Sequence, residues 1–235
     1  MNIGIIVCDR VDPILSAEFG EFADMIIETL SPHGDFNYQL FDAMEGVLPM
    51  TDHGCDGFII TGSTFDAYAD IDWINQLAQW IVTCDEAQTP LIGICFGHQI
   101  IARALGAQVA KSNKGWGIGM SVNQVTGQHD WMQPRKEMIN ILVSHQDQVL
   151  QLPDSLTTIA SSDFCPNYML IKQDHILTIQ GHPEFSTDFE YKLLERKREL
   201  VGEEAYQNAR TSLELLPDSA LIMQWFAQFF YRAVA

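Results

Sequence analysis

The sequence predicts a three-layer α/β protein: a mostly parallel central sheet with helices on both faces and a smaller antiparallel portion. Short apolar runs alternate with amphipathic stretches along the 235 residues. This alternation is typical of parallel sheets in which helices connect the strands. No linker, repeat or low-complexity segment divides the chain, so we expect residues 1–235 to form a single domain.

The first half of the chain has the clearest alternation. Residues 3–8, 58–61 and 91–94 are continuous apolar runs, which are typical of strands buried on both faces. Apolar residues at helical spacing predict helices over 19–30 and 73–84. The alternation of Phe36, Tyr38 and Leu40 predicts one more strand between the first helix and the second apolar run.

The second half of the chain has shorter elements. From about Lys111, apolar residues alternate over 118–122 and 139–143, which predicts the antiparallel portion. Residues 176–180 are the last clear strand.

The C-terminal part of the chain is predicted to be helical. Thr187 and Glu190 have the spacing of a capping box, and an apolar stripe over 221–230 indicates a helix. We therefore expect residues 190–235 to form a C-terminal helical extension.

Composition excludes several classes of protein. Thirteen basic and 31 acidic residues give a net charge of −18. Nucleic acid is therefore not expected as a partner, because binding its phosphates needs clustered Lys and Arg. No apolar run approaches the ~18 residues of a membrane span, and the first residues lack a secretory signature, so we expect no membrane contact and a cytoplasmic location.

Residues 90–106 are predicted to form a strand, a sharp turn and a helix. Gly93, Cys95 and Gly97 have the spacing of a nucleophile elbow, in which a strained turn exposes the nucleophile. At the helix N-terminus, the helix dipole and free N–H groups would favour the thiolate of Cys95. The N–H of Phe96 would point to the same place and hold a developing oxyanion. The alternative is an inert buried cysteine.

A cysteine nucleophile needs a base and a group that orients the base. Pro183 pushes His182 into an extended conformation, so the side chains of His182 and Glu184 would project to the same side. Glu184 would then bond one imidazole nitrogen and His182 would present the other to Cys95. The alternative is a structural turn with Glu184 as a favourable charge near the start of a helix.

A further glycine turn follows the strand that begins near residue 58. The backbone N–H of Gly62 or Ser63 is a candidate second oxyanion donor. The five cysteines and the histidines show neither CxxC nor HExxH spacing, and no phosphate-binding loop is present. We therefore expect no metal and no cofactor.

Together these motifs resemble the class I glutamine amidotransferases over about residues 3–190. The segments from Gly93 to Gln99 and from Gly181 to Glu184 match two specific motifs of that family, in its chain order. The resemblance implies that Cys95 is the nucleophile that forms a γ-glutamyl thioester, with His182 as general base and acid. It also implies that Glu184 orients His182 and that Gly62, Ser63 and Phe96 provide the oxyanion hole.

The same resemblance implies contacts with the substrate. Gln99 would help to hold the substrate glutamine, and Ser144, Gln146 and Asp147 would contact its amino-acid end. Many family members have Gly where this chain has Gln146, and Gly-Pro where it has Ser63-Thr64. The segments 62–67 and 112–116 are more similar to the stand-alone GMP-synthase-like subgroup, which includes the γ-glutamyl peptidases.

Three functions compete for this chain. The favoured one is cleavage of the γ-amide of glutamine, with ammonia released or passed to a synthetase partner, because the sequence contains no nucleotide site of its own. The alternative is a stand-alone γ-glutamyl peptidase with the same triad and a larger leaving amine. A non-catalytic binding domain is less favoured because all three triad residues are present.

Overall fold

The structure is a computed structural model that describes residues 1–50 and 54–234. The last residue of the expected C-terminal extension lies outside this range. The strands are β1 (Asn2–Val7), β2 (Asn37–Asp42), β3 (Gly57–Ile60), β4 (Leu91–Ile94), β5 (Gln108–Lys111), β6 (Gly117–Val125), β7 (Met138–His145), β8 (Asp147–Gln151), β9 (Thr157–Ser161), β10 (Met169–Lys172) and β11 (Ile176–Ile179). The helices are α1 (Pro13–Phe19), α2 (Phe22–Leu30), the short η1 (Ser31–His33), α3 (Asp72–Glu86), α4 (Phe96–Ala104), α5 (Thr187–Val201), α6 (Glu203–Ser212) and α7 (Ser219–Ala233).

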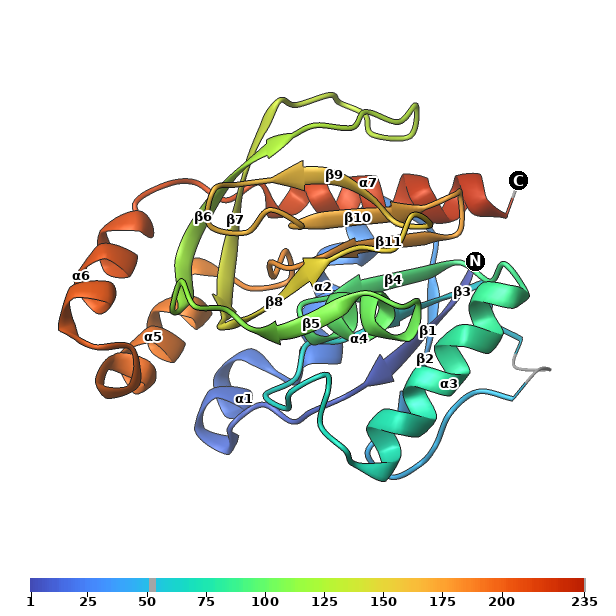
Figure 1. The fold of residues 1–235 in the computed structure, drawn as a ribbon, viewed down its shortest axis with the longest axis horizontal. Helices are drawn as coiled ribbons and strands as arrows, with labels where there is room; N and C mark the ends of the chain where they lie inside the picture. Colours follow the sequence, from blue (N-terminus) through green and yellow to red (C-terminus); the bar gives the residue numbers. More distant parts are fainter. Residues whose placement is uncertain (51–53, 235) are drawn as a thin grey trace.

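A nine-stranded sheet in the order β2-β1-β3-β4-β11-β10-β9-β6-β7 crosses the molecule (Figure 1). The first five strands of this order pair in parallel, and the remaining pairs are antiparallel. Strands β5 and β8 form a separate two-stranded antiparallel sheet. The predicted α/β class, with a parallel sheet and a smaller antiparallel portion, is confirmed.

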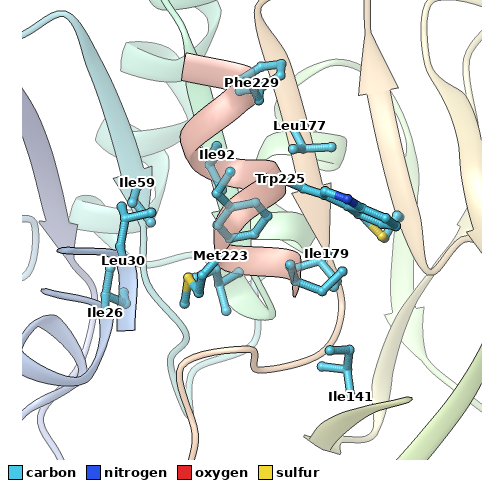
Figure 2. Close-up of a cluster of buried hydrophobic side chains, with 14 of the residues drawn as sticks. Ile26, Leu30, Ile59, Ile92, Ile141, Leu177, Ile179, Met223, Trp225 and Phe229 are labelled. Atoms are coloured by element: carbon cyan, nitrogen blue, oxygen red, sulfur yellow. The ribbon is translucent and has the colours of Figure 1, made fainter. Parts of the chain in front are cut away.

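Helices cover both faces of the parallel strands. Helices α2 and α7 pack on one face and α3 and α4 on the other. Adjacent strand residues alternate between the two cores, so Ile5 belongs to the α2/α7 side and Ile6 to the α3/α4 side. Figure 2 shows Trp225 and Phe229 of α7 lying against Leu177 and Ile179 in the first of these cores. Burial on both faces explains the continuous apolar runs in the sequence.

Two elements near the N-terminus differ from expectation. The helix predicted over 19–30 begins only at Phe22, because Phe19 ends a separate helix, α1, and Gly20 after it has a φ of 79°. A capping box formed by Glu21 and Asp24 then begins α2. In β2, Leu40 is 53% exposed whereas Phe41 is buried against Phe58, since β2 is an edge strand that is only partly covered.

The predicted capping box at the start of α5 is wrong. Ser186 is the N-cap, and its side chain accepts a hydrogen bond from the N–H of Phe189. The Glu190 carboxylate points into the protein, where it accepts a bond from the N–H of Gly119 at 3.2 Å. Glu190 therefore bonds to the backbone of β6 instead of to the N-terminal backbone of its own helix.

The carboxyl ends of the parallel strands meet on one edge of the sheet. The segments that follow β1, β3, β4 and β11 all supply residues to one cavity at this edge. Ligands of open α/β sheets bind at such carboxyl edges. In the part of the chain that the structure describes, no helix is long and apolar enough to cross a membrane.

Candidate active site

Cys95 lies in a strained turn between β4 and α4. Its φ of 51° and ψ of −100° are unusual for a residue with a side chain. A Cβ on Gly93 would lie 2.5 Å from the carbonyl oxygen of Gly97, and one on Gly97 would lie 2.3 Å from that of Ile60. The two glycines therefore permit the close approach of strand and helix that this turn requires.

Cys95 also occupies the N-cap position of α4. The N–H of Gly97 is bonded to the carbonyl oxygen of Thr61. Phe96 is the first residue of the helix, so its N–H has no acceptor within the helix. The Phe96 ring packs against Trp73, with the ring centroids 5.7 Å apart. The group that Phe96 contributes to the site is its backbone N–H.

His182 is held from three directions. Its N–H donates to the carbonyl oxygen of Leu142 at 2.8 Å, and Nδ1 lies 2.8 Å from Glu184 Oε1. The ring stacks on Phe185, with centroids 4.0 Å apart and an interplanar angle of 6°. His182 and Glu184 are both buried, so the imidazole has one defined orientation.

The backbone that brings Glu184 to His182 is not the extended segment we expected. Pro183 and Glu184 form a turn, and the N–H of Phe185 bonds to the carbonyl oxygen of His182 at 3.3 Å. The fixed φ of proline suits such a turn. The predicted contact between the two side chains forms nevertheless.

The charges around His182 favour its protonated form. Burial alone would lower the pKa of this imidazole, but Cys95 and Glu184 act against burial through charge and hydrogen bonding and raise the pKa to about 10. An imidazolium stabilised in this way can act as an acid toward a leaving amine.

The turn after β3 lies beside His182 and Cys95. A Cβ on Gly62 would be 2.9 Å from His182 Cε1 and 3.8 Å from Cys95 Cβ, so only glycine fits. The carboxylate of Asp9 holds the turn: its Oδ2 accepts from the N–H of Thr64 at 2.7 Å and from the Thr64 hydroxyl at 2.6 Å. Sequence reasoning missed Asp9, and its place directly after the first strand was the only available signal.

Two buried glutamines lie next to Cys95 or one another. Gln180 Nε2 donates to Cys95 Sγ at 3.6 Å, and Gln99 Nε2 donates to Gln180 Oε1 at 3.1 Å and to the carbonyl oxygen of Asp147 at 3.0 Å. The sequence singled out Gln99 but not Gln180. The signal for Gln180 was its position at the end of the last predicted strand, two residues before His182.

The site opens into a cavity of about 480 Å³. The predicted site residues that line it are Ser63, Cys95, Gln99, Ser144, Gln146, Asp147 and His182. Glu184 lies behind the ring of His182 and does not line the cavity, and neither do Gly62 and Phe96. The structure thus brings the predicted residues together. Seven of them line the cavity, and Gly62, Phe96 and Glu184 do not.

The other histidines near the site are buried and uncharged. Burial lowers the pKa of His98 to about 3 and that of His145 to about 4. His98 Nδ1 lies 2.7 Å from the Thr178 hydroxyl, and His145 Nδ1 lies 2.9 Å from the carbonyl oxygen of Asp147. Among residues 1–50 and 54–234, no three His, Cys, Asp or Glu side chains are grouped to hold a metal ion.

Charged groups gather at the Asp147 side of the cavity. Burial raises the pKa of Asp147, and the neighbouring Asp66 adds to this effect. Burial together with the two carboxylates raises the pKa of Tyr68 to about 12. Asp66, Asp147 and Lys111 all line the cavity, so this side offers both an acidic pair and a cation to a ligand.

Comparison with known proteins identifies the family of this chain. The model of the family "Glutamine amidotransferase class-I" matches residues 22–198. Gamma-glutamyl peptidase 4 of Arabidopsis thaliana is 33% identical over 204 residues, which is 83% of this chain and 79% of that protein. A glutamine-hydrolyzing GMP synthase chain of Sulfolobus acidocaldarius is 27% identical over 130 residues, which is 55% of this chain and 67% of that protein.

Solved structures show the same fold. A glutamine amidotransferase from Thermotoga maritima superposes with a TM-score of 0.75 at 18% identity, over 99% of this chain and 97% of that one. One from Methylobacillus flagellatus gives a TM-score of 0.70, also at 18% identity, over 99% and 93%. Because the family model matches residues 22–198, which is more than half of the sequence, the chain belongs to the class I glutamine amidotransferase family.

Proposed function

We propose that the protein hydrolyses the γ-amide bond of glutamine or of a γ-glutamyl compound, through a thioester on Cys95. The observation that carries the proposal is the placement of His182 between Cys95 and Glu184, with the 2.8 Å Nδ1–Oε1 contact, beside the strained turn that holds the cysteine. Cys95 is the nucleophile, His182 moves the proton and Glu184 orients His182.

The reaction needs two half-reactions. The Cys95 thiolate attacks the γ-carbonyl carbon, an S–C bond forms, and the oxyanion is held by the N–H groups of Phe96 and of Gly62 or Ser63. The imidazolium of His182 gives its proton to the leaving nitrogen, and the C–N bond breaks. His182 then takes a proton from water, which attacks the thioester and releases glutamate with the thiolate restored.

The glutamyl end is assigned to the Asp147 side of the cavity. Gln99, Gln146 and Asp147 form this side, with Asp66 adjacent, whereas the Ser144 hydroxyl is bonded to Lys197. We propose that the acidic pair Asp66 and Asp147 attracts the α-ammonium group and that Lys111 serves the α-carboxylate, while the Gln99 amide holds the backbone of Asp147. Contacts between these side chains and the opposite charges of the zwitterion fix the orientation of the substrate. They therefore also fix the direction in which its γ-amide enters the cavity.

The identity of the leaving amine separates two candidates. Glutamine would release ammonia, alone or to a synthetase partner, and a γ-glutamyl peptide would release a larger amine. The cavity continues along α1 and α5, where Leu15, Phe189 and Leu193 line it. Its 480 Å³ lies in the range of about 300–1,000 Å³ of pockets that hold drug-sized ligands, which favours the larger amine as second candidate.

The test is glutamate release from glutamine and from a panel of γ-glutamyl dipeptides. We expect Cys95→Ala to fold and to reduce kcat by at least about 10⁴-fold, because the nucleophile is lost. Cys55→Ala, which does not line the cavity, should retain wild-type rates. Wild-type activity in Cys95→Ala would reject the mechanism, and no release by the folded wild type would favour a binding domain.

A further inference from the structure

Helix α5 carries a cation into the cavity wall. The side chain of Lys197 is half-buried and lines the cavity together with Cys95. Its Nζ donates to the Ser144 hydroxyl at 2.7 Å and lies 5.0 Å from the centroid of the Trp116 ring. Ser144 and Trp116 also line the cavity. The three side chains come from different parts of the chain and form one cluster.

Lys197 differs from Arg10 and Arg196, the two arginines of the cavity, in making no ion pair with a carboxylate among the described residues. Arg10 pairs with Asp42, and Arg196 pairs with Asp12 at 2.5 Å. No ion pair found in residues 1–50 and 54–234 involves Lys197. Its bonded neighbours, a hydroxyl and an aromatic ring, leave its positive charge available to a ligand.

The acid that acts most on Lys197 is Glu190, two turns earlier on α5. Glu190 is fully buried, one of its oxygens accepts from the N–H of Gly119, and the other has no hydrogen-bond partner among the described residues. Burial raises the pKa of Glu190 to about 8 and so disfavours its charged form. It therefore compensates Lys197 incompletely.

A desolvated ammonium without a counter-charge gains most from an anionic ligand. Burial lowers the pKa of Lys197, whereas Glu190 and Cys95 raise it. An anion at its free N–H groups would reduce the cost of burying the charge.

The cluster is separate from the acidic side of the cavity. Lys197 lies on α5, whose Phe189 and Leu193 line the part of the cavity given to the leaving amine, whereas Asp147 begins β8 and Asp66 follows β3. The acidic side is assigned to the zwitterionic glutamyl end of the substrate. The Lys197 cluster is therefore available to bind the part of the substrate on the other side of the scissile bond. The Ser144 hydroxyl, committed to Lys197, then belongs to this second subsite.

We propose that Lys197, Ser144 and Trp116 form a subsite for a carboxylate on the leaving amine. The preferred substrates are then γ-glutamyl amino acids or peptides, rather than glutamine or neutral γ-glutamyl amines. This inference rests on the proposed γ-glutamyl hydrolysis and deepens it by naming the leaving group.

Two substrates that differ only in this charge test the subsite. Wild-type protein should cleave γ-glutamylglycine with a kcat/KM at least about tenfold higher than that for γ-glutamylglycinamide. In Lys197→Met this preference should disappear, through a higher KM for γ-glutamylglycine, while the rate on the glycinamide stays within about threefold. Lys192→Met, on the same helix but outside the cavity and paired with Glu18, should behave as wild type.

Two results would overturn the subsite. One is equal wild-type kcat/KM on both substrates. The other is an equal loss on both in Lys197→Met, which would place the lysine at the glutamyl end or in a structural role. If Lys197→Met does not fold, Ser144→Ala serves instead, with a several-fold loss of the same preference expected.

Binding to the Cys95→Ala protein separates failure of the subsite from failure of the proposed function. By calorimetry this protein should bind γ-glutamylglycine about tenfold more tightly than the glycinamide, and Cys95→Ala/Lys197→Met should bind both alike. Discrimination in binding without turnover by the wild type would reject the hydrolysis and retain the carboxylate subsite. Equal binding of both compounds to Cys95→Ala would reject the subsite whatever the turnover.

Discussion

The side chain of Glu184 is almost completely buried. It is 2% exposed, and one oxygen contacts His182 while the other has no partner among the described residues. A buried charge is costly unless it is paired, so the imidazolium of His182 and the carboxylate stabilise each other. This pairing sets the tautomer of His182 and leaves its second nitrogen for Cys95.

Glu184→Gln should lower kcat by roughly 10²–10⁴-fold, less than the loss of Cys95, because the nucleophile and the oxyanion donors remain. The negative charge of Glu184 is among the causes that raise the pKa of His182. Removing it lowers that pKa, so the alkaline limb of the kcat/KM profile should move to lower pH. An unmoved alkaline limb would contradict the role given to Glu184, and Glu199→Gln on the exposed face of α5 is the control.

At the scale of elements, the turn after β3 depends on the end of β1. Asp9 accepts two hydrogen bonds from Thr64, next to the Gly62–Ser63 donors. The two strands pair in parallel, so their carboxyl ends are adjacent and a short side chain can bridge them. The position of the turn proposed to hold the oxyanion is therefore fixed by a residue outside the turn.

Asp9→Ala should reduce kcat by about 10–100-fold with KM within about threefold, because a displaced donor weakens the oxyanion hole. Asp9→Asn keeps an acceptor oxygen at the same place and should recover most of the rate. Steady-state kinetics on glutamine and a γ-glutamyl dipeptide measure both variants. Equal kcat in Asp9→Ala and wild type would show that the turn holds its position without Asp9.

At the scale of the whole molecule, α7 completes one face of the sheet. Trp225, Phe226, Phe229 and Phe230 of this helix are buried in the same core as Leu177 of β11 (Figure 2). Strand β11 ends three residues before His182, so α7 supports the strand that leads to the proposed base.

Trp225→Ala should lower the free energy of unfolding by about 3–5 kcal/mol, because it leaves a cavity in this core. Urea denaturation followed by circular dichroism measures the change. Arg232→Ala, on the exposed side of the same helix, should shift stability by no more than about 0.5 kcal/mol. A Trp225→Ala midpoint equal to that of the wild type would mean that α7 is dispensable for the core.

The sequence alone was sufficient for features whose partners lie close together in the chain. The elbow follows from Gly93, Cys95 and Gly97, which are neighbours, and the contact of His182 with Glu184 spans two residues. Buried strands were recognisable because both of their faces are apolar. In each case periodicity or spacing expresses local backbone geometry, which a sequence records directly.

Only the tertiary structure decided contacts between distant segments. Gln180 reaches Cys95 across 85 positions, Asp9 reaches Thr64 across 55 and Lys197 reaches Ser144 across 53. Glu190 fits a local capping pattern yet bonds to Gly119, 71 positions away. These contacts depend on strand order and on which loops meet at the carboxyl edge of the sheet, and the spacing of residues along the chain does not encode that order.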